Sequence, residues 1–327
     1  MTKPFLKWAG GKSRVADELL RISQERPNST DWPVVSGQRY HEPFLGSGAM
    51  YFGLRSNGFI QTKKGPFLND INTILINCMK VVSDSGKLTR MIKQLESLQT
   101  DYSKQERNPR GQIKEVRQKR MYYIKRTELN SLSKKLSSLT VEEEIRLAAL
   151  MIFLNKTCYN GLWRMNRKGE FNVPEGDYDS PTNICQESVL DNCHGLMNRA
   201  KFSSKSWRET FSKVEPGDLV YLDPPYMPLE IDGNTFTSYY SGGFSKEDHI
   251  ELAKKSAQMV AERGPRVIAS NHDALGEPTI REIWQTAADN AKCDWAIKPI
   301  RVSRSISCRG HGRIKVNEVL IFLSPKK

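Results

Sequence analysis

Long apolar runs, paired cysteines and clustered histidines are all missing from this sequence, and each absence excludes a class of protein. No run of about 18 apolar residues occurs, so no membrane-spanning helix is expected. The first residues, MTKPFLKWAGGK, lack the apolar core of a secretory signal. The six cysteines form no Cys-x-x-Cys pair and the five histidines are dispersed, so we expect no metal site. These absences predict a cytoplasmic protein with reduced cysteines and no membrane partner.

Acidic residues are also in short supply. The chain has 37 Asp and Glu against 50 Lys and Arg, which gives a net charge of +13. Residues 104–135 carry eleven basic and three acidic side chains, and residues 298–315 carry six basic side chains and no acidic one. A solvated helix face and a basic tail would explain such runs, but two separated basic segments favour a groove for nucleic acid.

The length of 327 residues suits about two domains. Residues 1–75 and 196–327 mix short apolar runs with glycine-rich turns and capped helical patterns, which predicts one discontinuous α/β domain. We expect a Rossmann-like, doubly wound, mostly parallel sheet. Residues 76–195 are mainly helical and basic, with a capping box at Thr140 and Glu143 and a hairpin turn at 167–169. They are expected to form an inserted second domain.

The segment VYLDPPYMP at 220–228 places an acid where a buried strand must stop. Pro224 and Pro225 cannot donate to a sheet ladder, so Asp223 marks the end of the strand. In open α/β sheets, that edge is where ligands bind. A lone Asp-Pro would more simply be a solvated turn. The other motifs of the chain are needed to choose between that turn and a ligand-binding loop.

Two glycine-containing segments are comparable with nucleotide-binding motifs, and only the second favours such a ligand. GGKS at 10–13 is not a P-loop, because Leu6 stands where the first glycine is required. In EPFLGSG, Gly46 and Gly48 allow a tight turn and close approach of a ligand, and Asp70 ends the next apolar run. An acid at this position can bind both ribose hydroxyls, which favours an adenosine-containing cofactor. The alternative is that Asp70 caps a helix.

Five segments in this order, FLKWAGGK, EPFLGSG, NDIN, YNGLWRMNRKGEFNVPEG and DPPY, resemble the Dam-type (D12 class) DNA adenine N6-methyltransferases. The resemblance implies the S-adenosylmethionine-dependent methyltransferase fold, S-adenosylmethionine as cofactor, and an adenine flipped out of double-stranded DNA. It implies a catalytic loop at Asp223, Pro224, Pro225 and Tyr226. By motif position, the implied cofactor-contacting residues are Trp8, Lys12, Phe44, Gly46, Gly48, Asp70 and Asp223.

The catalytic loop suits methylation of an exocyclic amine. The adenine N6 lone pair is delocalised into the ring, so the amine is a poor nucleophile. Asp223 and the Pro224 carbonyl can each accept one N6–H bond and turn the lone pair toward the methyl donor. Tyr226 offers a ring on which an extruded base can stack. A sulfonium donor is already activated, so this chemistry requires no metal.

The inserted region is expected to read DNA. Arg164 on the hairpin suits a bidentate contact to guanine, whereas Arg167 and Lys168 at the turn suit phosphates. The alternative for each is a solvated charge. The resemblance marks the DNA-facing residues as Lys7, Tyr159, Asn160, Arg164, Asn166, Arg167, Lys168 and Pro174. Asp177, with Glu175 also acidic, departs from the basic residue common there, so we expect a target that contains GA but differs from GATC.

The interpretation favoured is therefore a site-specific DNA adenine N6-methyltransferase. A cytosine N4-methyltransferase is the nearest alternative, although such enzymes more often carry Ser in place of Asp223. A DNA-binding protein with an inactive site is the other alternative, and the intact loop at 223–226 speaks against it. We expect a monomer on DNA, with any cognate restriction endonuclease acting separately.

Overall fold

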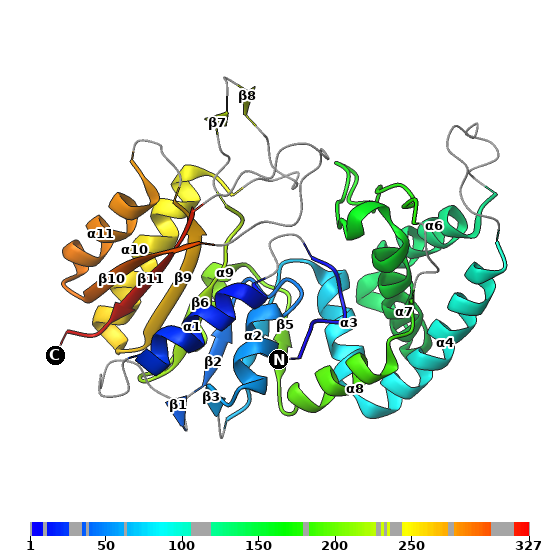
Figure 1. Cartoon of the computed structure of the whole chain (residues 1–327), viewed down its shortest axis with the longest axis horizontal. Helices are drawn as coiled ribbons and strands as arrows, with labels where there is room; N and C mark the ends of the chain where they lie inside the picture. The colour runs from blue at the N-terminus through cyan, green and yellow to red at the C-terminus, as the bar shows by residue number, and fades with distance from the viewer. Residues whose placement is uncertain are drawn as a thin grey trace.

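The structure is a computed structural model that describes residues 2–8, 12–25, 35–36, 39–61, 64–105, 119–178, 183–226, 230–231, 234–235, 244–273, 278–301 and 317–326. A seven-stranded sheet with the order β10-β11-β9-β6-β2-β4-β5 forms its centre (Figure 1). Its strands are β2 (Tyr40–Glu42), β4 (Phe67–Asn69), β5 (Lys201–Ser203), β6 (Leu219–Leu222), β9 (Arg266–His272), β10 (Asp294–Arg301) and β11 (Asn317–Ser324). Two short pairs lie outside it: β1 (Val35–Ser36) with β3 (Ile60–Gln61), and β7 (Glu230–Ile231) with β8 (Asn234–Thr235).

The sheet is mixed but mostly parallel, as the sequence predicts. Neighbours from β5 through β4, β2 and β6 to β9 run parallel, whereas β11 is antiparallel to both β9 and β10. The chain builds outward from β2 to β4 and β5, and then returns to place β6 on the other side of β2. The carboxyl ends of β2 and β6 therefore flank a topological switch point, where α/β sheets bind ligands.

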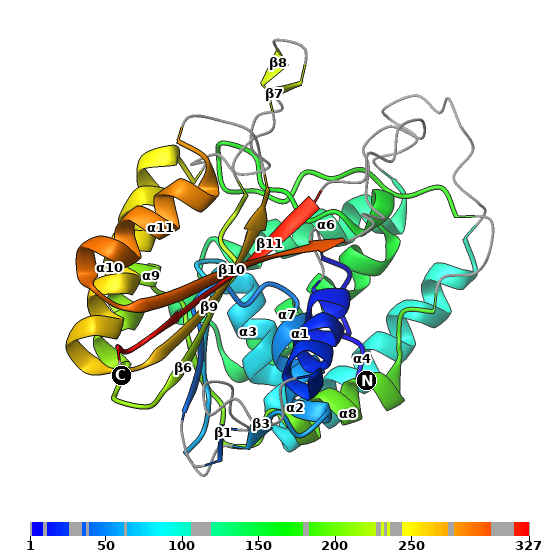
Figure 2. The same ribbon diagram turned by 60° about the vertical axis from the view of Figure 1, so that its left-hand side comes forward.

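Both faces of the central strands β6 and β9 are buried, which explains their continuous apolar runs. Alternate residues face opposite sides: Leu219 and Tyr221 pack in one core with α1 (Ser13–Glu25) and α2 (Ala49–Ser56). Val220 and Leu222 pack in the other core, with α10 (Lys246–Arg263) and α11 (Ile280–Ala291). Figure 2 shows these two helical layers on either side of the sheet, with α9 (Trp207–Thr210) beside α10.

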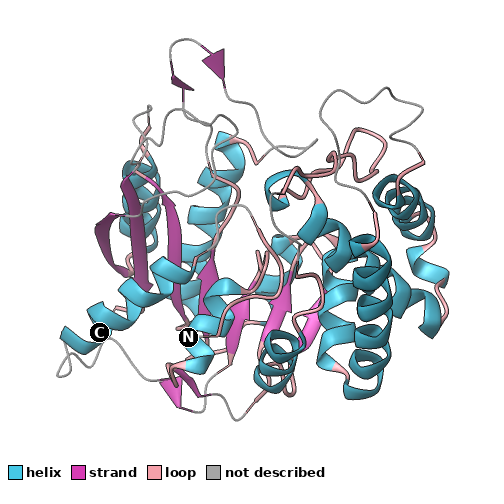
Figure 3. Cartoon of the chain, turned by 45° about the vertical axis from the view of Figure 1, so that its right-hand side comes forward, coloured by secondary structure: helices cyan, strands magenta, loops and turns pink. Residues whose placement is uncertain are grey.

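The remaining helices gather beside the sheet (Figure 3). They are α3 (Thr73–Ser83), α4 (Ser85–Ser103), α6 (Met121–Ser133), α7 (Val141–Thr157) and α8 (Glu187–Leu196), with the 3-10 turns η1 (Leu136–Ser138), η2 (Tyr159–Gly161) and η3 (Phe211–Lys213) at other points of the chain. Residues 147–157 of α7 are buried on every side, so α7 is the central helix of this group. The capping box of Thr140 and Glu143 starts α7, and Ser245 and Asp248 form the same motif at α10, as predicted. Within the described ranges, no helix is both long and apolar enough to cross a membrane.

Candidate active site

Acidic side chains from four strands lie together at one end of the strands, where the parallel strands finish; we call this end the sheet edge. Glu42 is the last residue of β2, Asp70 follows β4, and Asp223 follows β6. Glu318 is the second residue of β11, but because β11 runs antiparallel its beginning lies at the same edge. Carboxylates that the sequence separates by up to 276 positions, counted from residue 42 to residue 318, therefore share one edge of the sheet.

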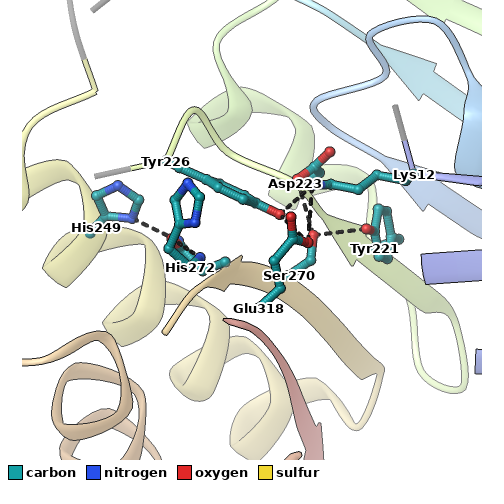
Figure 4. Close-up of polar contacts among 9 residues, drawn as sticks. Lys12, Tyr221, Asp223, Tyr226, His249, Ser270, His272 and Glu318 are labelled. Atoms are coloured by element: carbon teal, nitrogen blue, oxygen red, sulfur yellow. Dashed lines mark hydrogen bonds and ion pairs between the residues drawn. The ribbon is translucent and has the colours of Figure 1, made fainter. Parts of the chain in front are cut away.

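Asp223 stands in a network of polar contacts (Figure 4). Its Oδ1 accepts a hydrogen bond of 3.0 Å from the Ser270 hydroxyl and lies 3.3 Å from the Lys12 ammonium. Lys12 also lies 3.5 Å from Glu318 Oε2 and hydrogen-bonds to the Tyr226 hydroxyl, which donates to the same Glu318 oxygen over 3.1 Å. A single buried ammonium is thus shared between two carboxylates.

Burial dominates the acid–base properties of this edge. It raises the pKa of Asp223 above its usual range; Lys12 opposes the rise, Glu318 adds to it and the Ser270 hydrogen bond opposes it. Burial also raises the pKa of Asp70 and, well above its usual range, that of Glu42. The hydrogen bond from Tyr40 to Glu42 opposes that rise, and the charges of Asp223 and Asp70 add to it. An edge that disfavours further negative charge suits a cationic ligand.

The rest of the predicted catalytic loop is held by packing. Pro224 is buried and Pro225 is exposed. The Tyr226 ring makes an edge contact with His272, at 4.3 Å between ring centres. Lys12 lies 4.2 Å from the centre of the Tyr226 ring. The loop predicted from the two prolines therefore forms at the end of β6, with Asp223 and Tyr226 facing the same ammonium.

The predicted cofactor residues fall into two groups. Around the glycine turn, the Gly46 N–H donates to Asp70 Oδ2 over 2.9 Å, and a side chain at Gly46 would meet the Trp8 ring at 3.0 Å. Gly46 and Gly48 both adopt positive φ, of 51° and 75°, which glycine allows without strain. Phe44 lies nearby on the sheet edge and packs edge-on against Phe244. Lys12 belongs to the other group, at Asp223.

Asp70 does not cap a helix with its side chain. The cap of α3 is Asn72, whose Oδ1 accepts from the backbone of Ile74 and Leu75. Asp70 instead accepts from the Asn72 and Gly46 N–H groups, so the carboxylate ties the glycine turn to the start of α3. The capping alternative weighed from the sequence is therefore wrong.

Several residues predicted to face DNA come together where the N-terminal segment meets η2. The buried Asn155 side chain accepts from the Lys7 N–H over 2.8 Å and donates to the Lys7 carbonyl over 2.8 Å. A side chain on Gly161 would meet Lys7 carbons at 2.5 Å, and the Tyr159 N–H donates to the Pro174 carbonyl over 2.9 Å. The side chains of Lys7, Tyr159, Asn160 and Pro174 are exposed here.

The hairpin predicted around 167–169 is present. Met165 and Phe171 form an antiparallel bridge, and Asn166 Oδ1 accepts from the backbone of Lys168 and Glu170. Asn166 thus uses its amide oxygen within the turn, while Arg167 and Lys168 are exposed at its tip. The Arg164 Nε donates to Asn172 Oδ1 across the hairpin over 2.9 Å, and the Arg164 side chain is exposed.

Trp163 is partly buried and packs against the core. Its ring stacks on Phe171 at 4.4 Å and on Trp8 at 6.4 Å between ring centres. Trp163 therefore joins the hairpin to the segment that carries Trp8 and Lys7.

Glu175 corrects one sequence-based expectation. Its carboxylate accepts from Arg120 over 2.7 and 2.9 Å and from the Tyr102 hydroxyl over 2.8 Å, and its side chain is fully buried. Glu175 is therefore part of the structure and not a second acid facing DNA, whereas Asp177 is exposed. Most of the basic segment 298–315 lies outside the described residues, as does the part of the first basic segment at 106–118.

Three residues of the site escaped the sequence analysis. Glu42 begins the EPFLGSG segment, in which only Phe44, Gly46 and Gly48 have a predicted role. Ser270 directly precedes Asn271, which is buried and contacts His249. Glu318 precedes an apolar run in the sequence. It reaches the sheet edge beside Asp223 only because β11 runs antiparallel to β9.

Comparisons with known proteins give one family match and several full-length relatives. The sequence profile of the D12 class N6 adenine-specific DNA methyltransferases matches residues 8–295. The type II methyltransferase M.MjaIII of Methanocaldococcus jannaschii is 33% identical over 311 residues, 95% of each chain. A DNA adenine methylase of Serratia marcescens is 32% identical over 97% of each chain, and one of Escherichia coli K12 is 30% identical over 99% of this chain and 96% of the relative.

Proposed function

The chain belongs to the D12 class of N6 adenine-specific DNA methyltransferases, and from that premise we propose that it transfers a methyl group from S-adenosylmethionine to one flipped adenine at a specific site in duplex DNA. The observation that carries this proposal is the position of Asp223 at the switch point of the sheet, one-fifth exposed and followed by two prolines. The site thereby combines an accessible carboxylate with a rigid backbone carbonyl.

Asp223 and Pro224 act on the target amine. The carboxylate and the Pro224 carbonyl each accept one N6–H bond, which pulls the amine out of conjugation and aims its lone pair. The two prolines restrict φ and so hold that carbonyl still. Tyr226 supplies an aromatic ring against which the extruded base packs.

The residues at the sheet edge fit the proposed cofactor. The ligand would carry cationic centres and ribose hydroxyls, and the edge offers four carboxylates, from Glu42, Asp70, Asp223 and Glu318, near one lysine. Trp8, Phe44, Gly46, Gly48 and Asp70 would hold its adenosine part, and Lys12 with Asp223 would border its reactive part. When bound, S-adenosylmethionine supplies a methyl group already activated on a sulfonium.

We place target recognition in residues 76–195, inserted between the catalytic parts 1–75 and 196–327. Lys7, Tyr159, Asn160 and Pro174 would contact DNA beside the active site, and Arg167 and Lys168 would contact phosphates at the hairpin tip. Asn166 would keep that tip in shape. This assignment rests on the exposure of these side chains other than Asn166, and on the hydrogen bonds that join Lys7 to Asn155 beside them.

Arg164 is the proposed reader of guanine. Asn172 holds its Nε, and no described residue hydrogen-bonds to its two terminal nitrogens, so both can reach guanine O6 and N7. Asp177 would accept from a cytosine or adenine amine. We therefore propose a target that contains a GA step and differs from GATC elsewhere.

Labelled S-adenosylmethionine and plasmid DNA test the activity, with nucleoside analysis of the product. We expect N6-methyladenine and no N4-methylcytosine, on a protein that binds DNA as a monomer. The name of the relative M.MjaIII places that protein among type II methyltransferases, so a separately acting restriction endonuclease is a proposed partner. Label on cytosine, or none on DNA, would contradict the proposal.

A further inference from the structure

The two oxygens of Asp223 are used unequally. Both polar contacts of its carboxylate, from the Ser270 hydroxyl and from the Lys12 ammonium, go to Oδ1. No residue in the described part of the chain forms a hydrogen bond or an ion pair with Oδ2. The carboxylate is thus fixed through one oxygen while the other is left for a ligand.

Ser270 is placed to fix that oxygen. It lies on β9, the parallel neighbour of β6, in a register that pairs Leu222 with Ala269 and so sets Ser270 beside Asp223. Its side chain is fully buried, and its hydroxyl lies 2.8 Å from the Tyr221 hydroxyl. Figure 4 shows Ser270 between Tyr221 and Asp223.

The direction of these hydrogen bonds follows from the donors that each group possesses. An ionised carboxylate can only accept, so the single Ser270 proton points to Asp223. Tyr221 must then donate to the Ser270 oxygen. Burial, with the nearby charge of Asp223 adding to it, holds the pKa of Tyr221 well above its usual range, so Tyr221 keeps the proton that this relay requires.

We propose that Ser270 is a positioning residue for methyl transfer, which holds Asp223 through Oδ1 and directs Oδ2 toward the target amine. This role rests on the proposed function of Asp223. Lys12 cannot supply the same constraint, because its long side chain is shared with Glu318 and Tyr226. Ser270, by contrast, is a short side chain on a central strand and has a second partner that fixes its hydroxyl.

The test compares Ser270→Ala with the wild type and with Ser256→Ala. Ser256 is a matched control, because it is equally buried in α10 and its hydroxyl has no hydrogen-bond partner among the described residues. At saturating cofactor and DNA, we expect the single-turnover methylation rate of Ser270→Ala to fall by about tenfold to a hundredfold, the usual effect of one hydrogen bond to a charged group. Tyr221→Phe keeps Ser270 but removes the hydrogen bond to its hydroxyl, so the methylation rate should fall by a smaller factor. Ser256→Ala should match the wild type.

A pH profile separates positioning from a general structural effect. Without the Ser270 hydrogen bond, the Asp223 carboxyl should protonate at higher pH, so the acidic limb of the rate profile should move upward in Ser270→Ala and not in Ser256→Ala. The charged and titratable groups that face Asp223, which are Lys12, Glu42, Tyr221, Tyr226 and Glu318, are unchanged in Ser270→Ala. An unchanged rate, or a slower rate with an unmoved acidic limb, would overturn the role of Ser270.

A measurement without turnover keeps this inference apart from the proposed function. Carbon NMR of aspartate carboxyls, with Asp223→Asn to identify the signal, reports the Asp223 titration in the ligand-free protein. We expect the midpoint to rise in Ser270→Ala and not in Ser256→Ala. Equal midpoints in all three proteins would refute the contact itself, whether or not the enzyme methylates adenine.

Discussion

Single side chains at the sheet edge acquire their chemistry from one or two neighbours. Asp223 is an accessible acceptor because Ser270 and Lys12 bind only one of its oxygens. Glu42 lies on the same edge, yet it is buried behind Tyr40 and its pKa is raised well above the usual range, so it is a poor candidate for the same task. Exposure and contacts, more than residue type, therefore favour Asp223 over Glu42 for the proposed role of hydrogen-bond acceptor.

A buried histidine beside the loop should make stability depend on pH. Burial lowers the pKa of His249 from 6.5 to about 4, with the Pro225 backbone and Asp248 opposing the shift. Since the unfolded chain then binds the proton more readily, the contribution of His249 to stability is complete above about pH 6.5 and is lost as the pH falls toward 4. In urea unfolding, the free energy of unfolding should fall between pH 7 and pH 5. At still lower pH, the total loss from His249 should reach about 3 kcal/mol.

The variant His249→Gln tests the source of that slope. Its free energy of unfolding should change less between pH 7 and pH 5 than that of the wild type, whatever its absolute stability. Equal slopes in the two proteins would assign the pH dependence to other groups.

Glu175 and Asp177 provide a second test at this scale, because two neighbouring acids have different environments. Glu175→Gln leaves the Arg120 guanidinium without its buried charge partner and should cost about 3–5 kcal/mol of unfolding free energy. Asp177→Asn, at an exposed position, should change it by less than about 0.5 kcal/mol. Urea unfolding of the two variants measures both. Similar midpoints would contradict the structural role of Glu175.

At the scale of elements, features set by neighbouring residues could be predicted from the sequence, whereas features set by strand pairing could not. The end of β6 was predictable, because two prolines after an apolar run leave no other place for Asp223. The capping boxes of α7 and α10 were predictable for a similar reason, since their spacing is local. Glu318 was not, because strand direction in β11 is set by pairing with β9 and leaves no mark in the sequence.

The hairpin and the N-terminal segment pack together as one unit. Asn155 binds both backbone groups of Lys7, and Trp163 stacks between Trp8 and Phe171. A residue expected to contact cofactor and residues expected to contact DNA are thereby packed together. In the sequence these residues belong to two separate motifs, and only long-range packing unites them.

Arg164→Ala tests the hairpin as a reading element. Loss of a bidentate guanine contact should cost about 1–3 kcal/mol of discrimination at one base pair and relax the sequence preference there. The measurement is methylation of a library of duplexes, followed by sequencing of the modified sites. Lys168→Ala at the exposed tip is the control and should weaken all sites alike. An unaltered preference in Arg164→Ala would contradict the guanine contact, and strict GATC methylation by the wild type would contradict the proposed target.

At the scale of the whole molecule, the charge excess is the feature that bears on DNA. Part of the basic segment 104–135 belongs to the fold, because Arg120 binds the buried Glu175. Lys134 and Lys135 pair with Glu170 and Glu143 at the surface, where such ion pairs contribute little to stability. Replacing every basic residue would therefore damage the fold as well as the interaction with DNA. Arg120 has to be retained in any test of the segment.

Neutralising Lys119, Lys134 and Lys135 to Gln should weaken binding to all DNA sequences similarly. It should also reduce the slope of the salt dependence by about 0.9 for each DNA phosphate that the variant no longer neutralises. A control with Lys254→Gln and Lys255→Gln, both exposed on α10, should leave the slope unchanged. Fluorescence anisotropy over a range of salt measures both variants. Unchanged affinity and slope in the first variant would identify the segment as a solvated face.

The most direct test of the account is the Asp223→Ala variant in a single-turnover assay with saturating labelled S-adenosylmethionine and duplex DNA. If Asp223 is the acceptor that prepares the adenine amine, the variant should lose methyl transfer by a factor of at least about a thousand, because a positioned acceptor contributes several kcal/mol to the transition state. Binding of cofactor and of DNA, measured on the same preparation, should persist. Transfer within tenfold of the wild type, with both ligands bound, would contradict the central claim.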